Sequence, residues 1–173
     1  MRPALPLVVT LVALAPASAF GSTAPRSVLP ADSLEAALLA ELNVVRAENG
    51  LRTLRLDTQL TAAAGQHSRE MVKSGYFGHE SADGSVFWKR IKRFYGPRVR
   101  PGTWAVGENL LWRESGVSAR AAVRAWLRSP GHRENLLGPS FRDVGIAALR
   151  ATAAPGVYGH RRVLVLTVDF GAR

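Results

Sequence analysis

The most informative segment for the architecture is Arg162-Val163-Leu164-Val165-Leu166-Thr167-Val168-Asp169-Phe170, near the end of the chain. It is rich in β-branched and aliphatic side chains, which predicts a strand. Because its apolar run is nearly continuous rather than alternating, we expect other elements to cover both faces of this strand. A second strand signal, from Val144 to Arg150, precedes it, and the connection between them contains Pro155-Gly156. The two segments therefore predict a long antiparallel hairpin.

Helical patterns occupy much of the chain before this hairpin. Apolar residues at helical spacing predict a first helix that ends at Gly50, with Asp32 or Ser33 as its N-cap. The same criteria predict a second helix between Asp57 and Gly75. A third helix is predicted at residues 118–128, because Pro130 and Gly131 end it, and a shorter basic helix at about residues 85–94. A further strand is predicted at residues 106–112. We therefore expect an α+β fold in which a small mixed or antiparallel sheet is sandwiched between helices.

The composition is that of one soluble globular domain. The chain has 173 residues, no cysteine and 47% hydrophobic residues. Its 23 Lys and Arg residues against 13 Asp and Glu give a formal net charge of +10, which favours anionic partners such as acidic envelope polymers or lipid head groups. The charge has a second interpretation, because arginine and alanine are both abundant, as GC-rich coding sequences tend to specify.

The N-terminal residues predict export. Residues 1–19 have the pattern of a signal peptide, with Arg2 before an apolar stretch and Ala17-Ser18-Ala19 as the cleavage site. That apolar stretch is too short to span a bilayer, so we expect a secreted product and no transmembrane segment. Residues 20–33 are predicted to form a flexible linker and residues 34–173 the folded domain. Without disulfides, a hydrophobic core must stabilise this domain.

Several common catalytic motifs are absent from the sequence. There is no G-x-S-x-G elbow, no H-E-x-x-H, no phosphate-binding glycine-rich loop and no cysteine nucleophile. The remaining candidates are polar residues within apolar or turn-rich segments. They are His79 in Phe77-Gly78-His79-Glu80-Ser81, Glu108 in Gly107-Glu108-Asn109-Leu110, and His132 in Ser129-Pro130-Gly131-His132-Arg133-Glu134-Asn135.

These three segments resemble, in order and context, motifs of the CAP superfamily, which is named for cysteine-rich secretory proteins, antigen 5 and pathogenesis-related proteins. The resemblance extends from about Leu34 to Gly171 and includes Thr167-Val168-Asp169-Phe170-Gly171, which is similar to the closing strand of the family. The segment from Trp126 to Leu137 resembles the bacterial branch, in which the loop before the second histidine is short. The lack of cysteine agrees with that branch.

The resemblance implies a three-layer α-β-α sandwich with a small, mostly antiparallel central sheet and a surface cleft. Carried onto this chain, the cleft residues are His79, Glu108 and His132. Some family members bind a divalent metal there, so these three residues are implied as ligands of an ion such as zinc, which suits two imidazoles, a carboxylate and open water positions. The second carboxylate of the eukaryotic pattern is missing, because Ser129 stands at the corresponding position.

Two functions follow as expectations. The first is a secreted, monomeric, non-enzymatic binding module that recognises an anionic envelope polymer, a lipid or a partner protein. It is favoured because no complete set of nucleophile, base and orienting residue is found. The alternative is a metal-dependent hydrolase acting at the cell envelope. In that case His79 and His132 would hold the ion, and Glu108 would be a ligand or the general base.

Each candidate also has a purely structural interpretation. Glu108 could bond the backbone amides of a neighbouring loop, and His132 could be a turn or N-cap residue. His67 lies in an inward, alanine-rich helical stripe and is expected in the core or behind the cleft. His160 is expected in solvent, and the four tryptophans are expected in the core.

A basic segment follows His79. It could grip an anionic polymer or form a solvated helix face, and nucleic acid is not expected as a partner because no recognised binding module is present. Its six basic residues are Lys89, Arg90, Lys92, Arg93, Arg98 and Arg100.

Overall fold

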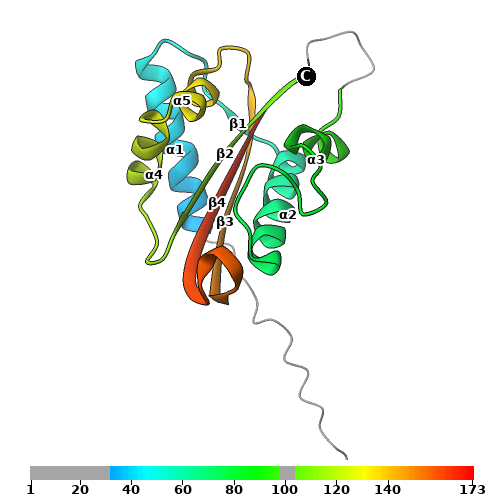
Figure 1. The fold of residues 1–173 in the computed structure, drawn as a ribbon. Coiled ribbons are helices and arrows are strands. Elements are labelled where there is room, and N and C mark those ends of the chain that lie inside the picture. Colours follow the sequence, from blue (N-terminus) through cyan, green and yellow to red (C-terminus); the bar gives the residue numbers. More distant parts are fainter. Residues whose placement is uncertain (1–31, 98–103) are drawn as a thin grey trace, which may run out of the picture.

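The computed structural model describes residues 32–97 and 104–173. A central sheet lies between two layers of helices (Figure 1), which confirms the predicted α+β sandwich. The elements in chain order are α1 (Asp32–Glu48), β1 (Arg55–Leu56), α2 (Thr58–Ser74), α3 (Phe87–Phe94), β2 (Ala105–Arg113), α4 (Ala119–Leu127), α5 (Pro130–Leu137), β3 (Asp143–Ala154), η1 (Gly156–Tyr158) and β4 (Arg161–Ala172).

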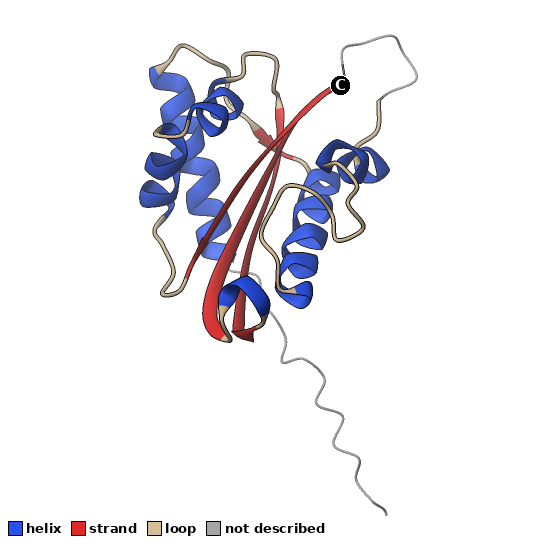
Figure 2. Cartoon of the chain, viewed as in Figure 1, coloured by secondary structure: helices blue, strands red, loops and turns tan. Residues whose placement is uncertain are grey.

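The sheet is built around the predicted hairpin. Strands β3 and β4 pair antiparallel, and the four strands are ordered β1-β3-β4-β2, with β2 antiparallel to β4 and β1 parallel to β3. Figure 2 shows the three long strands crossing the whole molecule as one twisted layer. All residues of β4 from Val163 to Ala172 are buried, because both faces of this central strand are covered. Because neither face of β4 meets solvent, its sequence is apolar at nearly every position instead of alternating.

The two faces of the sheet have separate cores. Leu164, Leu166 and Val168 point into the larger core, which includes buried side chains of α1, α4 and α5. Val163 and Val165 point the other way, into a core shared with α2. Figure 1 shows α1, α4 and α5 on one side of the sheet and α2 with α3 on the other. A charged side chain on the second face of β2 therefore lies under α2 and α3.

Helix α2 lies very close to the sheet. Its N-terminus is capped by Asp57, whose side chain accepts hydrogen bonds from the backbone N–H groups of Gln59 and Leu60. A Cβ added at Gly145 of β3 would stand 2.0 Å from the backbone carbon of Leu60. Glycine is therefore required at position 145 by space rather than by backbone conformation.

The outer edge of β3 is covered in two ways. Strand β1 pairs with it only through Arg55 and Leu56, opposite Asp143 and Val144. Further along, the carboxylate of Glu35 in α1 accepts a hydrogen bond of 2.9 Å from the backbone N–H of Ala148. A side chain thus occupies one of the positions where a neighbouring strand would pair.

Three elements were not predicted: β1, α5 and the short 3-10 helix η1 in the connection of the hairpin. Pro130 and Gly131 were expected only to end the preceding helix, but Pro130 is also the first residue of α5. Proline fits this position because its missing N–H has no partner there in any helix. The predicted signal peptide, residues 1–19, and most of the predicted linker, residues 20–33, lie outside the described residues, and α1 begins at Asp32. Among the described helices, none is long and apolar enough to cross a membrane.

Candidate functional site

A cleft of about 550 Å³ opens beside the edge strand β2, between α5 on one side and the segment leading into α3 on the other. It contains all three residues singled out from the sequence. Its lining residues are His79, Glu80, Val86, Phe87, Trp88, Glu108, Ser129, Gly131, His132 and Asn135. The structure thus brings together residues from three separate segments of the chain.

Glu108 forms the floor of this cleft, and both of its carboxylate oxygens are engaged. Oε1 lies 2.8 Å from Nδ1 of His79, and Oε2 is paired with the guanidinium of Arg90. The Glu108 side chain is fully buried, and Arg90 is 2% exposed. A buried carboxylate requires such partners, because its transfer from water costs several kcal/mol, as a rough figure. Glu108 therefore supports the cleft from below.

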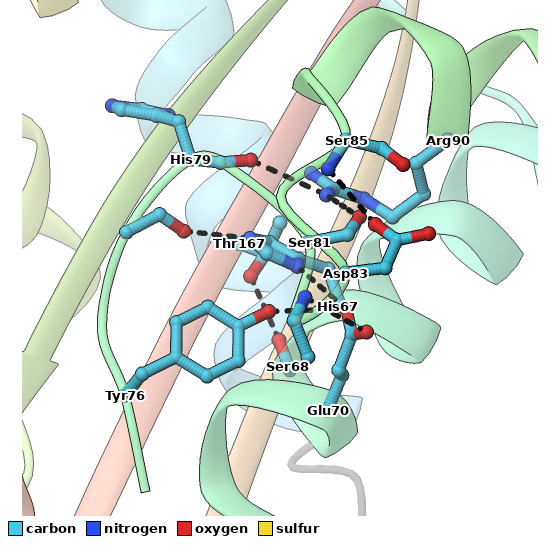
Figure 3. A network of polar contacts seen from close by, with 12 residues as sticks. His67, Ser68, Glu70, Tyr76, His79, Ser81, Asp83, Ser85, Arg90 and Thr167 are labelled. Atoms are coloured by element: carbon cyan, nitrogen blue, oxygen red, sulfur yellow. Dashed lines mark hydrogen bonds and ion pairs between the residues drawn. The ribbon is translucent and has the colours of Figure 1, made fainter. Parts of the chain in front are cut away.

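In the sequence, Arg90 belongs to a basic segment that was interpreted as a solvated helix face or as a grip on an anionic polymer. The structure corrects this interpretation for Arg90, which is buried. Its guanidinium donates hydrogen bonds to Oγ of Ser81, at 3.0 Å, and to the carbonyl oxygen of His79, at 3.3 Å (Figure 3). Arg90 thus ties the His79 segment to Glu108. Its position three residues after Phe87 and one before Ile91, both on the inner face of α3, is the signal that could have indicated burial.

The rest of the basic segment differs from Arg90. Lys89, Lys92 and Arg93 are exposed, as expected of a solvated helix face. Arg98 and Arg100 lie outside the described residues. The expectation of core packing for the tryptophans also fails at Trp88, which is 40% exposed on the rim of the cleft, whereas Trp126 is buried in the core.

His67 lies behind Glu108, in agreement with its predicted inward position. It is fully buried, and its Nε2 lies 2.9 Å from the carbonyl oxygen of Gly78 and 3.9 Å from Oε2 of Glu108. Because the carbonyl can only accept, Nε2 carries the proton. Burial is the main cause that lowers the pKa of His67, so the ring is neutral at neutral pH.

Asp169 is a second buried carboxyl group beside Glu108. The two residues are directly opposite each other in the β2–β4 pair. Burial, followed by the charge of Glu108, raises the pKa of Asp169 well above its usual range. No sequence argument singled out this residue, because Asp169 is one polar position within an apolar strand.

The two cleft histidines lie across from each other. Their ring centroids are 6.2 Å apart. The hydrogen bond with Glu108 raises the pKa of His79, whereas burial, followed by repulsion from His79, lowers the pKa of His132. Asn109 and Asn135 join α5 to β2, because Asn109 donates to the carbonyl oxygen of His132 and Asn135 to that of Glu108. The position of His132 is therefore fixed through backbone contacts.

The donor groups in the cleft fit a metal only in part. Among the described residues, no group of three or more His, Cys, Asp or Glu side chains is arranged to hold an ion. His79 uses Nδ1 for Glu108, which leaves its other ring nitrogen for a ligand. Glu108 itself faces His79 and Arg90. Ser129, which stands where the eukaryotic pattern has a second carboxylate, lines the cleft, and so does the exposed carboxylate of Glu80.

A three-layer sandwich with two histidines and a glutamate in a cleft at its edge strand is the arrangement of the CAP class of domains. The chain belongs to this class: the model of the cysteine-rich secretory protein (CAP) family matches residues 39–170. The protein YkwD of Bacillus subtilis is 31% identical to it over 126 residues, which are 72% of this chain and 45% of YkwD. The chain spans less than half the length of the curated relatives it matches.

Solved structures agree on the fold. An extracellular SCP-domain protein of Bacillus anthracis is 27% identical, with a TM-score of 0.63 over 82% of this chain and 41% of the other. An outer surface protein of Borrelia burgdorferi is 22% identical, with a TM-score of 0.67 over 85% of this chain and 99% of the other. The second likeness concerns the fold alone.

Proposed function

We propose that this protein is an extracellular recognition domain that binds a ligand in the His79–His132 cleft without catalysing a reaction. The observation that carries this proposal is the full engagement of the Glu108 carboxylate, whose two oxygens face His79 and Arg90. A general base must reach the proton that it removes, and this carboxylate is buried behind His79. The cleft offers binding groups without the base that the hydrolase alternative assigned to Glu108.

The cleft presents two kinds of surface to a ligand. Its floor carries the polar groups of His79, His132 and Asn135, and its rim carries the apolar side chains of Val86 and Trp88, each 40% exposed. Such a combination suits a ligand with one polar group and an adjoining apolar portion. An envelope component, a lipid or a segment of a partner protein has this character.

Two considerations support a location outside the cytoplasm. Residues 1–19 have the pattern of a signal peptide. The B. anthracis structural relative is described as an extracellular protein.

A divalent metal is part of this proposal. His79 and His132 would hold the ion, with Glu108 orienting the His79 ring through Nδ1, as carboxylates commonly do behind metal-bound histidines. When bound, zinc would supply a Lewis-acidic point for a carboxylate, carbonyl or phosphate oxygen of the ligand. The hydrolase alternative is favoured by one feature, the exposed carboxylate of Glu80 in the same cleft, which could serve as a base.

Zinc calorimetry combined with a protease assay tests the proposal. At about pH 7.5 we expect one-to-one zinc binding that weakens as the pH falls, beginning above about 6.5, because imidazoles must be neutral to coordinate and the pKa of His79 is raised. The double variant His79→Ala, His132→Ala should lose this binding, and the matched variant His160→Ala, at an exposed histidine away from the cleft, should keep it. With zinc present, fluorescent casein should stay intact.

The outcomes separate the alternatives. Casein cleavage that is lost in Glu80→Gln would replace the recognition domain by a hydrolase. Zinc binding that survives in the double variant, or no zinc binding at all, would remove the metal from the proposal.

A further inference from the structure

A second and larger cavity, of about 960 Å³, lies at the far end of the sheet from the C-terminus, where the β3–β4 hairpin and the connection from β2 to α4 meet. We call it the hairpin groove. Its lining residues are Glu114, Ser115, Gly116, Arg150, Ala151, Thr152, Arg161, Arg162, Val163 and Leu164. It shares no residue with the His79–His132 cleft.

The hairpin groove carries an excess of positive charge. Arg150 pairs in register with Leu164, and Arg162 precedes Leu164 by two residues, so both arginines lie on the same face of the sheet. Glu114, the one acidic residue of the lining, forms an ion pair with Arg161. Within the described residues, no ion pair engages Arg150 or Arg162. Two guanidinium groups therefore face the groove without a counter-charge.

The surrounding sequence extends this charge. No acidic residue occurs between Asp143 and Asp169, and none occurs between Glu114 and Glu134. Helix α4 begins three residues after Gly116 of the groove and carries a row of exposed arginines one turn apart, so that consecutive members are about 6 Å apart along the helix axis. The row consists of Arg120 and Arg124 within α4 and Arg128, the C-cap residue that directly follows it.

We propose that the hairpin groove, together with the arginine row of α4, binds a linear polymer with repeated phosphate groups. The planar guanidinium matches phosphate oxygens with paired donors, which makes arginine well suited to phosphate recognition. A row of cations one turn apart favours a chain of anions over a single small ion, because each further contact adds to the affinity. This site is independent of the His79–His132 cleft and of what the cleft binds.

Two other occupants fit the groove less well. Insertion into a membrane requires exposed apolar side chains beside the basic residues. Of the large hydrophobic side chains exposed in the described part of the chain, none lines the groove. Residues 20–31 of the chain itself contain no acidic residue, so this segment has no negative charge to offer the arginines.

Binding of long-chain inorganic polyphosphate to the purified protein, followed by fluorescence anisotropy, tests the proposal. If about four arginines contact phosphates, each contributing about 0.7 to the salt slope, raising the salt from about 50 to about 200 mM should weaken binding roughly 50-fold. Orthophosphate at the same total phosphate concentration should bind far more weakly. Vesicles of phosphatidylglycerol should not compete with polyphosphate.

A matched pair of variants locates the site. The double variant Arg150→Gln, Arg162→Gln should weaken polyphosphate binding about tenfold or more and reduce the salt slope by about 1.4. The control Arg52→Gln, Arg69→Gln removes the same charge at exposed positions outside the groove and should change binding less than about twofold. Zinc binding by the groove variant should be unchanged, so that failure of one site is not mistaken for failure of the other.

Three results would overturn the proposal. Equal weakening in both double variants would show that net charge alone attracts the polymer. Orthophosphate that competes as well as polyphosphate would replace the polymer by a small anion. Binding to phosphatidylglycerol vesicles but not to polyphosphate would make the surface a membrane contact.

Discussion

The ion pair between Glu108 and Arg90 is the contact on which the cleft depends most. Both side chains are buried, and Arg90 also holds the carbonyl oxygen of His79 and the hydroxyl of Ser81. Removing one member of such a pair leaves an uncompensated charge in the interior. The loss should therefore affect the stability of the whole domain as well as the local geometry.

We predict that Glu108→Gln lowers the free energy of unfolding by about 3–5 kcal/mol, because Arg90 then keeps a buried charge without its counter-ion. Urea denaturation measures this change. The double variant Glu108→Gln, Arg90→Gln should lose less than the sum of the two single variants. The control Glu134→Gln, at an exposed position, should change stability by less than about 0.5 kcal/mol. Strict additivity of the two single changes would contradict the prediction.

The sequence identified the cleft residues better than it identified their partners. His79, Glu108 and His132 occur in short motifs, and the structure places all three in one cleft. Arg90 and Asp169 escaped notice because a charged residue in a helix or strand normally faces water. Helical spacing could have indicated the burial of Arg90, but the partners of both residues lie on other elements, and local patterns do not encode that pairing.

Among the elements, the contact between α2 and β3 is so close that it leaves no space for a side chain at Gly145. Gly145 lets the first turn of α2 lie directly on the strand, with the backbone of Leu60 and Thr61 in the place of a side chain. The local sequence signals predicted α2 and the hairpin. They could not predict how closely the two pack, because that depends on how the surface of α2 fits the surface of β3. The short β1 was missed for a similar reason: its two residues lie beside β3 next to the point where the first turn of α2, which follows β1 directly, packs on Gly145.

We predict that Gly145→Ala destabilises the domain by about 1–3 kcal/mol or more, because the new methyl group would overlap the backbone of α2, which cannot shift without moving the helix. Thermal unfolding followed by circular dichroism checks this. Gly131→Ala is the matched control, since no atom lies within 4 Å of a Cβ at that position. Unfolding temperatures within about 1 °C of each other for the two variants would argue against this close packing.

For the whole molecule, Asp169 makes stability depend on pH. Its folded-state pKa is raised by burial and by Glu108, whereas in the unfolded chain it is close to about 3.9. The folded protein therefore retains a proton that the unfolded chain has lost. Between these two pKa values the free energy of unfolding must fall as the pH rises.

We predict that Asp169→Asn removes this contribution while preserving the shape of the side chain. Above about pH 4, the native protein should lose stability with rising pH more steeply than the variant does. Urea unfolding at a series of pH values measures the difference. Parallel curves for the two proteins would mean that Asp169 titrates alike in both states.

The fold also determines where on the molecule the net positive charge lies. The net charge of +10 pointed to anionic partners without a location, since composition carries no positions. Folding concentrates part of this charge at the hairpin groove, where the arginines of two strands share one face. The basic segment at residues 89–100, interpreted from the sequence as a solvated face or a polymer grip, instead contributes one of its cations, Arg90, to the interior.

The hydrogen bond from Ala148 to the Glu35 carboxylate also has a consequence for solubility at high concentration. An open strand edge is a template on which a second molecule can add its own strand and begin aggregation. Strand β1 shields only the first two residues of β3, so most of that edge depends on other cover. The carboxylate of Glu35 repels the backbone carbonyl of an incoming strand. It also already accepts the hydrogen bond from the N–H of Ala148 that this carbonyl would otherwise accept. The first helix thus blocks one pairing position at this open edge, where a second chain could otherwise add a strand, in addition to closing one side of the core.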